Sequence, residues 1–377
     1  MFELFWGRVQ ILAKSDAASA LQLAPTNATA LINTNWSRID THRIDDIQSA
    51  IKQPIAQSAL RAEPFTQLAL LELKSGNDQT AKTYFQTAQK RNPRSRGAAR
   101  GLFDLNVKEE DYGGALDQLD LLLRLDRRLS NEYFATLLPF AQNPRAQSAL
   151  KEKLVQGASW APQFLSYLTN QIVPAKFMAE LIQETPFNDP QMRTKLQSSF
   201  LTKMLQKGNY QNAKSYWEAF VGLETTRPEL PYDNLFESKP GPLPFNWRLI
   251  NSATHSAELI KPGLHGYFSG NRTTVLAEQY VSLPVDIPHQ LSVRADHNIR
   301  RRHGHFSWRL VCHPDNQILA KLEFSGVSTG LRRTTNAFKI DHETCPLQKL
   351  QLLGIVGEYT SGITLTTHAV LLEPIPS

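Results

Sequence analysis

The chain has 377 residues, of which 41% are hydrophobic and 20% charged, and 41 Lys and Arg against 35 Asp and Glu leave a formal net charge of +6. This composition excludes an intrinsically disordered chain, which combines low hydrophobicity with high net charge. No apolar run approaches the roughly 18–20 residues of a membrane span, so we expect a globular protein of two domains without a transmembrane segment.

The first residues do not form a secretory signal peptide. Glu3 and Arg8 interrupt the apolar stretch, and no basic region precedes it. Ala13, Ala20 and Pro25 match the last part of a helical repeat whose first helix would precede Met1. We therefore expect the natural chain to start further upstream.

The segment 62–95 contains two helices with matching apolar faces. Small and aromatic residues recur at spacings of three and four on either side of a Gly-Asn-Asp turn, and a proline ends the second helix. The positions concerned are Phe65, Leu68, Ala69, Gly76, Ala81, Phe85, Ala88 and Pro93. This pattern resembles a tetratricopeptide (TPR) repeat, in which alanines allow two helices to approach closely and aromatics fill the groove between them.

Weaker copies of the same pattern flank this repeat. They cover 99–126, where an Asp-Arg pair replaces the proline, the degenerate stretch 36–64, and 200–220 with Gly208 and Trp217. Irregular helices fill 130–192. We predict an α-solenoid of TPR-like helix pairs over residues 1–224, which the resemblance expects to bind a protein or peptide partner in its concave groove. The candidate groove residues are Lys74, Lys82, Gln86 and Arg100, whereas Phe65, Phe85 and Trp217 occupy packing positions.

Residues 225–245 contain five prolines, and average composition predicts about one. Proline removes a backbone donor and breaks helices, so this stretch ends the solenoid. We predict a semi-rigid linker here, which lies against one of the domains.

From 246 to 377 hydrophobic residues recur at every second position. Phe306, Trp308, Leu310 and Cys312 share one face of a strand, and about nine or ten such strands follow one another, with Gly, Pro, Asp and Asn in the turns. The segments are 246–250, 257–260, 264–269, 273–283, 290–296, 305–312, 318–324, 335–340, 347–353 and 363–373. This spacing predicts an antiparallel β-sandwich.

The order of these strands resembles a jelly-roll module of the galactose-binding or carbohydrate-binding kind. The residues that carry the resemblance are the segments 277–284, 289–296, 305–312 and 345–354. Together with the helical repeats they are similar to TPR-plus-sandwich proteins of Gram-negative bacteria associated with exopolysaccharide production. The resemblance implies a glycan ligand, although the sequence has no assignable aromatic platform and no Asp/Asn-rich calcium loop.

The two cysteines, Cys312 and Cys345, lie at predicted strand ends, where a disulfide is geometrically possible. It would close a loop of about 33 residues and stabilise the fold by on the order of 3 kcal/mol. Two buried thiols are the alternative. A zinc site with His313 and His342 is disfavoured, because the spacings match no usual zinc pattern. A disulfide predicts an oxidising compartment.

Two surface features are the candidate ligand-binding residues of the sandwich. Tyr267 stands in a His-Gly-Tyr-Phe segment and is a candidate for stacking on a sugar, whereas Trp247 and Trp308 are predicted to pack inside. The loop with Arg300, Arg301, Arg302, His303 and His305 can hold an acidic saccharide, a phosphate or a carboxylate partner, and Arg332-Arg333 extends it if the two loops are close. The alternative is a solvated loop. One basic cluster is too little to favour a nucleic acid as partner.

Catalysis has little support in the sequence. Nucleophile-elbow, zinc-protease, P-loop and dinucleotide motifs are all missing. A metal on His297, His303 and His305 is disfavoured, and no cofactor is expected. A carbohydrate-active enzyme would need two converging carboxylates, for which the sandwich offers Glu278, Asp286, Asp296, Glu323 and Glu343.

These observations favour a non-enzymatic adaptor of the cell envelope or periplasm. The repeats would hold a protein partner, and the sandwich a glycan or a second protein. The alternatives are a cytosolic scaffold with reduced cysteines and a carbohydrate-active enzyme with its site on the sandwich.

Overall fold

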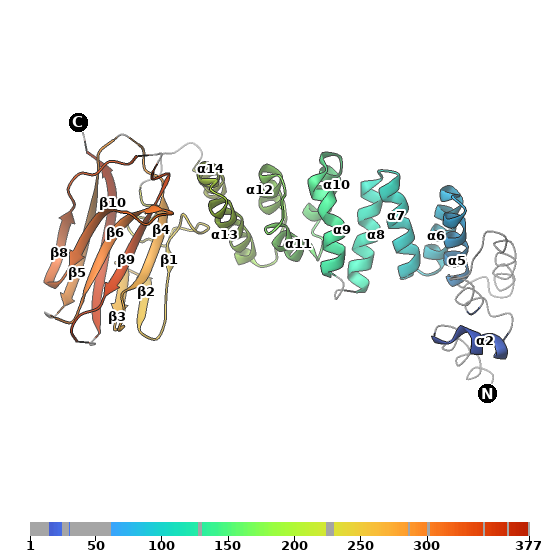
Figure 1. Ribbon diagram of the computed structural model, residues 1–377, viewed down its shortest axis with the longest axis horizontal. Coiled ribbons are helices and arrows are strands. Elements are labelled where there is room, and N and C mark those ends of the chain that lie inside the picture. Colours follow the sequence, from blue (N-terminus) through green and yellow to red (C-terminus); the bar gives the residue numbers. More distant parts are fainter. Residues whose placement is uncertain are drawn as a thin grey trace. The chain divides into compact units, whose positions relative to one another are not determined.

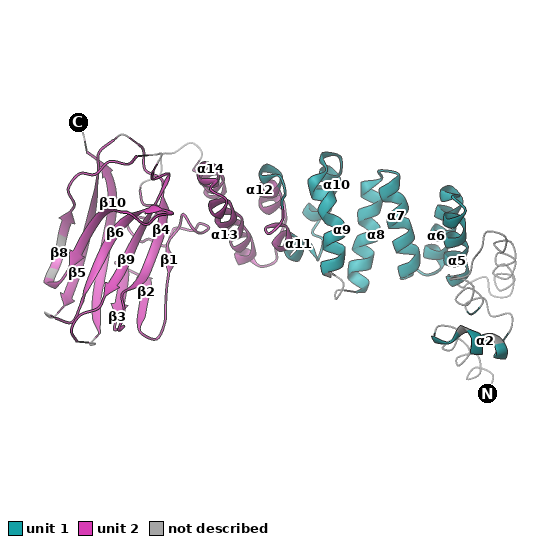
Figure 2. Ribbon diagram, in the orientation of Figure 1, with its two compact units in different colours: residues 1–164, 172–177 teal, residues 165–171, 178–377 magenta. Residues whose placement is uncertain are grey.

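The computed structural model describes residues 15–24, 30, 62–126, 130–223, 230–285, 287–299, 302–341, 344–359 and 362–375 (Figure 1). The chain divides into two compact units, shown in Figure 2. Unit 1 comprises residues 1–164 and 172–177, and unit 2 comprises 165–171 and 178–377. Helices α13 and α14 therefore belong to the same compact unit as the β-strands.

The described residues before 224 are mainly helical. The helices are α2 (Ala17–Leu23), α5 (Glu63–Lys74), α6 (Asp78–Arg91), α7 (Arg96–Lys108), α8 (Tyr112–Leu125), α9 (Ser130–Gln142), α10 (Pro144–Val155), α11 (Ala161–Leu168), α12 (Ala175–Glu184), α13 (Pro190–Gln206) and α14 (Tyr210–Val221). The predicted repeat over 36–64 lies almost wholly outside the described residues, as do Ala13 and Pro25. Among the described residues no helix is long and apolar enough to cross a membrane.

The best-matched repeat forms the helix pair α5 and α6, which packs on α7. Ala69, Ala81 and Ala88 are fully buried, as their TPR-like spacing predicts. The buried ring of Phe85 lies against Gly101 of α7, where an added Cβ would come within 2.2 Å of the ring. Close approach of the helices thus depends on small residues on one helix and an aromatic on its neighbour.

Two ion pairs and a hydrogen bond join different helix pairs of unit 1. Lys108 pairs with Asp78, Arg145 pairs with Glu110 at 3.1 Å, and the indole nitrogen of Trp160 donates to Asp120 at 3.0 Å. The partners are 30 to 40 residues apart in sequence. Such exposed ion pairs stabilise weakly, but their spacing of about one repeat helps to set the register of one helix pair on the next.

The second half of the chain forms ten strands among the described residues. These are β1 (Arg248–Leu249), β2 (His255–Ile260), β3 (Gly263–Phe268), β4 (Thr274–Val281), β5 (His289–Ile299), β6 (His305–His313), β7 (Ile318–Phe324), β8 (Gly326–Thr334), β9 (Leu347–Ile355) and β10 (Ile363–Pro374). They form two antiparallel sheets, in the orders β1-β4-β9-β6-β7 and β2-β3-β10-β5-β8. The predicted fold class, TPR-like helices followed by an antiparallel sandwich, is confirmed.

One predicted strand is wrong. Residues 335–340 form no strand apart from a single bridge between Phe338 and His289, and the strand before them is β8. β8 lies at the edge of its sheet and pairs with β5 alone. Its polar, glycine-containing sequence does not alternate hydrophobic and polar residues, because an edge strand with few buried side chains does not require that pattern.

Trp308 lies at the centre of the sandwich core, as the sequence analysis predicts. It is fully buried, and its indole nitrogen donates to the Thr367 hydroxyl at 3.2 Å. Trp247 packs edge-on against it at 5.7 Å between ring centroids, and Phe236 lies 5.3 Å from Trp247. The expectation that both tryptophans pack inside is therefore correct.

The described residues of the proline-rich segment pack against the sandwich. The carbonyls of Tyr232 and Phe245 accept hydrogen bonds from the buried amide of Gln279 at 3.0 and 2.7 Å. The carbonyls of Leu230 and Asn234 accept from Leu372 and Val370 of β10 at 2.9 and 3.0 Å. Segment 230–247 therefore covers the length of β10 that β3 leaves unpaired, through the backbone carbonyls of Leu230 and Asn234.

Three histidines of unit 2 predict a pH dependence of stability. Burial lowers the pKa of His289, His297 and His313 below the usual 6.5. The unfolded chain then binds more protons than the folded chain as the pH falls below about 6.5, so the free energy of unfolding decreases there and reaches its full value above 6.5.

We expect urea midpoints of the intact protein to fall between pH 7.5 and pH 5, before most carboxylates titrate. The variant His313→Gln should reduce this slope, whereas His265→Gln, for a half-buried histidine on the outer face of β3, serves as the control. Equal midpoints at both pH values would contradict the prediction.

Candidate functional site

Tyr267 lies on the outer face of the sheet that contains β3 and β10. On β3 it alternates with Leu264 and Phe268, which are buried in the core, and it is 37% exposed. It pairs with Thr364 of β10, and His265 pairs with Thr366. The period-two pattern of a strand thus places Tyr267 and His265 side by side on one outward face.

Gly362 positions the ring of Tyr267. A Cβ on Gly362 would come within 2.6 Å of the ring and 2.7 Å of its hydroxyl. The ring therefore lies directly on the backbone that enters β10. The absence of a side chain at residue 362 leaves the space that the ring occupies.

The loop before β6 lies at the same end of the sandwich. His305 pairs with Ile355 at the end of β9, and the Tyr359 amide donates to the Arg302 carbonyl at 3.1 Å. Gly304 and Gly357 touch closely enough that a Cβ on Gly357 would come within 2.1 Å of the Gly304 nitrogen. Gly362 follows in the same connection to β10. The connection between β9 and β10 therefore contacts both candidates, the loop before β6 at residues 357–359 and Tyr267 at Gly362.

The charged groups of this end are exposed and weakly paired. Arg302 and Glu358 are each 65% exposed in their side chains and lie 3.5 Å apart, and the rings of His303 and Tyr359 lie 5.5 Å apart. Arg302 and His305 line one hollow of about 400 Å³ together with Glu358. We name Tyr267, Arg302, His303, His305 and Tyr359 the loop-end site.

Two predicted members, Arg300 and Arg301, lie outside the described residues. Tyr359, which is 53% exposed, was missed by the sequence analysis because nothing in its local sequence indicates that it meets His303. Arg332 lies elsewhere, paired with Glu373 near the far end of β10, at 2.7 Å. Arg332 does not extend the basic loop. Arg333 donates to the Glu323 carbonyl, and the Glu323 carboxylate lies 3.7 Å from His305, so Arg333 is the member of the pair that lies near this loop.

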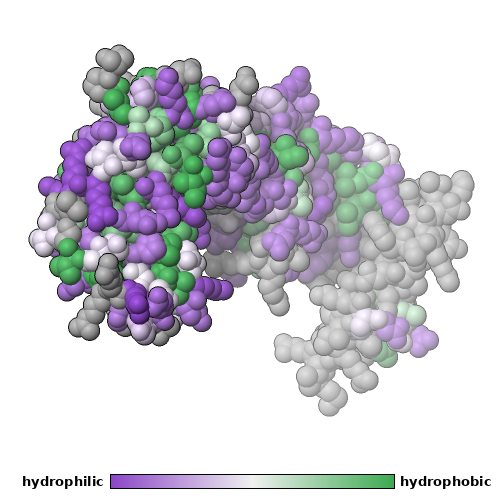
Figure 3. All heavy atoms as spheres, turned by 60° about the vertical axis from the view of Figure 1, so that its left-hand side comes forward, coloured by the Kyte–Doolittle hydropathy of each residue, from purple (hydrophilic) through white to green (hydrophobic). Residues whose placement is uncertain are grey.

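The outer face beside Tyr267 is polar. The His265 ring contacts the Thr366 hydroxyl at 3.2 Å, and His368 pairs with Asp296 at 2.8 Å. The side of the sandwich turned forward in Figure 3 likewise mixes hydrophilic residues with small hydrophobic areas. Such a surface offers many hydrogen-bonding groups around one aromatic ring.

The acidic candidates for catalysis have separate partners. Glu278 pairs with Arg248 at 3.2 Å, Glu323 with Lys321 at 2.5 Å, and Asp296 with His368. The hydrogen bond from Lys321 is the main cause that lowers the pKa of Glu323. Asp286 and Glu343 lie outside the described residues. Among the described residues no three His, Cys, Asp or Glu side chains form a metal-binding group.

The groove candidates of unit 1 divide into two kinds. Lys82 pairs with Glu109 at 2.5 Å, and Arg100 pairs with Asp104 at 3.2 Å. Lys74 and Gln86 are exposed on α5 and α6. The ion pairs give Lys82 and Arg100 a structural contact besides any role in binding.

Cys312 and Cys345 form a disulfide, with Cα atoms 5.2 Å apart. Cys312 lies near the end of β6, and Cys345 precedes β9, so two neighbouring strands of one sheet are joined. Both residues are buried. The predicted pairing is therefore present, and the zinc alternative with His313 and His342 is wrong because both thiols are consumed.

No family model matches the chain, and no curated protein matches it. Solved structures with similar parts include the TPR protein YrrB, described as having an unusual peptide-binding site. The match has 17% sequence identity and a TM-score of 0.25, and it covers 47% of this chain and 94% of YrrB. PilF of Pseudomonas aeruginosa matches at 12% identity and a TM-score of 0.26, and the match covers 53% of this chain and 78% of PilF. The carbohydrate-binding module TmCBM61, solved with β-1,4-galactotriose, matches at 12% identity and a TM-score of 0.24, and the match covers 34% of this chain and 88% of that module. At these identities and TM-scores the similarities do not establish a function.

Proposed function

We propose that this chain is a non-catalytic scaffold whose sandwich binds a glycan at the loop-end site. The observation that carries the proposal is the exposed ring of Tyr267, which lies on the backbone of Gly362, in the same connection whose Tyr359 amide donates to the Arg302 carbonyl. Sugar rings present apolar C–H faces and hydroxyl edges. An exposed aromatic with polar neighbours complements both, because the ring buries apolar area and the neighbours hydrogen-bond.

The charges favour an acidic glycan. Arg302 and His303 are cationic or protonatable, and the 3.5 Å pair of Arg302 with Glu358 is exposed, so a carboxylate of the ligand can replace Glu358 at little cost. The planar guanidinium then binds the ligand carboxylate through two parallel hydrogen bonds.

The helix pairs of unit 1 supply the second half of the proposed scaffold. Their exposed residues, including Gln86 and Lys74, would contact a protein or peptide partner, which places the glycan near that partner. The buried disulfide favours an oxidising compartment such as the periplasm over the cytosol. A role in exopolysaccharide production or export fits such an adaptor.

The test is a glycan array, followed by titration of the intact protein with the best acidic and neutral hits. We expect Tyr267→Ala to weaken binding at least tenfold, about 1.4 kcal/mol, because the stacking surface is removed. Arg302→Gln should weaken binding of the acidic glycan and leave its neutral analogue unchanged.

Ile260→Ala is the matched control, since Ile260 is an exposed residue on the same sheet at its opposite end. Wild-type binding by Tyr267→Ala, or no glycan bound by the wild type, would refute the proposal.

A further inference from the structure

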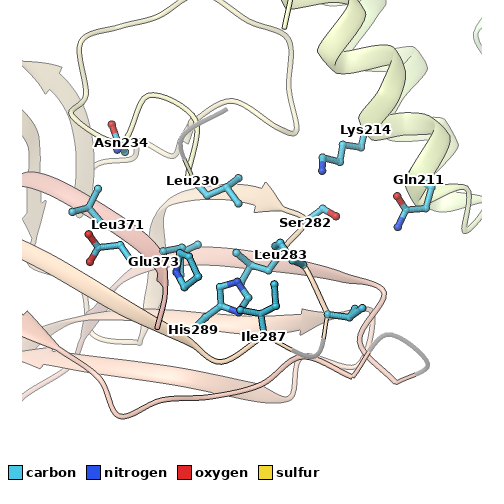
Figure 4. A pocket seen from close by; sticks show the side chains of 14 residues that line it. Gln211, Lys214, Leu230, Asn234, Ser282, Leu283, Ile287, His289, Leu371 and Glu373 are labelled. Carbon is cyan, nitrogen blue, oxygen red and sulfur yellow. The ribbon is translucent and has the colours of Figure 1, made fainter. Parts of the chain in front are cut away.

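A second cavity lies at the opposite end of the sandwich from the loop-end site. It has a volume of about 650 Å³, within the range of roughly 300–1,000 Å³ that small-molecule pockets occupy. Figure 4 shows Lys214 and Gln211 extending from α14 on one side, Glu373 and Leu371 on the side of β10, and His289 below. All of its described lining residues belong to unit 2.

The wall of this cavity is largely aliphatic. The main contributors are Leu230, Leu283, Val285, Ile287 and Leu371. No Phe, Tyr or Trp is present among its described lining residues, so a sugar has no ring on which to stack. The cavity therefore suits an aliphatic chain and differs in chemistry from the loop-end site.

Two buried polar atoms of the wall lack a well-aligned hydrogen-bond partner. They are Nδ1 of His289, a residue that is 1% exposed, and Oδ1 of Asn234, which is 4% exposed. The imidazole is held in place because it stacks on Phe338 at 6.2 Å, and the backbones of the two residues exchange hydrogen bonds at 2.8 and 2.9 Å. A buried donor without a partner carries a desolvation cost, which a ligand carboxylate recovers at Nδ1 of His289 when that atom carries the proton. Oδ1 of Asn234 is an acceptor, so a carboxylate does not pair with it.

The charges at the rim select the head group of the ligand. Glu373 is neutralised by Arg332 at 2.7 Å, whereas the ion-pair partner of Lys214 among the described residues is Glu218, at the longer distance of 3.7 Å. Lys214 is thus the more available charge, and it favours an anion.

We propose that this cavity binds a small aliphatic carboxylate. The chain of the ligand would lie along the leucine, valine and isoleucine wall, and its carboxylate would pair with Lys214. A hydrogen bond between the ligand head group and Nδ1 of His289 adds to the affinity. This site is independent of the glycan proposal, since the two sites share no residue.

The test is calorimetric titration of the intact protein with decanoate, below the concentration at which it aggregates, and with decanol as the uncharged analogue. We expect saturable binding of decanoate with one site per chain. Lys214→Gln should weaken the binding of decanoate at least tenfold and should change the affinity for decanol little. Lys207→Gln is the control, because Lys207 is an exposed lysine at the end of α13 that does not line the cavity.

Ile287→Glu provides a second test that does not depend on Lys214. Ile287 is 38% exposed, so an acidic side chain is tolerated there and its charge should exclude decanoate. No binding of decanoate to the folded wild type would overturn the proposal, and so would equal binding by wild type, Lys214→Gln and Ile287→Glu. Loss of glycan binding leaves this test unaffected, so the two proposals fail separately.

Discussion

Replacing Cys312 and Cys345 together by alanine is expected to lower the free energy of unfolding of unit 2 by about 3 kcal/mol. The disulfide closes a chain separation of 33 residues, and without it the unfolded chain regains the conformational entropy of that loop. Alanine avoids placing a hydroxyl in the buried position. The measurement is urea unfolding followed by tryptophan fluorescence, without and with reductant.

The reductant serves as an internal control for this prediction. Reduced wild type should unfold at the midpoint of the double alanine variant, and the variant should not respond to reductant. Thiols that alkylate freely in the native wild type would contradict the pairing. That outcome would also remove the support for an oxidising compartment and favour the cytosolic scaffold.

Phe85→Ala is expected to destabilise unit 1 by about 3–5 kcal/mol, the usual cost of removing a fully buried phenylalanine. Phe85 fills the space above Gly101, which no side chain occupies. Ala81 and Ala88 lie in the same cluster and are too short to fill the cavity that the substitution leaves. Urea unfolding monitored by circular dichroism at a helical wavelength measures the loss.

A double-mutant cycle tests the contact itself. Gly101→Ala should destabilise the wild type, since its Cβ would come within 2.2 Å of the Phe85 ring, and should cost much less in the Phe85→Ala background. Tyr84→Ala, a neighbour on α6 that is only half-buried, is the control and should cost less than Phe85→Ala. Additive effects of the two substitutions would show that the ring does not fill this space.

Parts of the candidate site were predictable residue by residue. Tyr267 and Arg302 each stood out in their own sequence segments, as an aromatic in a polar strand and as a cation in a basic loop. Their common location was not predictable, because it depends on the connection between β9 and β10, which contacts both. Contacts across such a connection leave no periodic signal along the chain.

The aliphatic cavity had no signal at all in the sequence. Its wall comes from α14, segment 230–234, the end of β4, and the termini of β5 and β10, so its residues are up to 163 positions apart. His289 looked like an ordinary strand residue. Its imidazole is buried only because Phe338 and the ends of two strands enclose it.

The local pattern of the chain was enough for the helix pairs, most strands, the two packed tryptophans and the disulfide. Each of these follows from a short-range rule, a period of about 3.6 or of two, or a pair of cysteines at strand ends. Strand β8 and the packing of the proline-rich segment on β10 required the folded structure. An edge strand with few buried side chains needs no alternating pattern, and backbone hydrogen bonds to the carbonyls of the proline-rich segment leave no signal in side-chain hydrophobicity. Neither arrangement could therefore be read from the sequence.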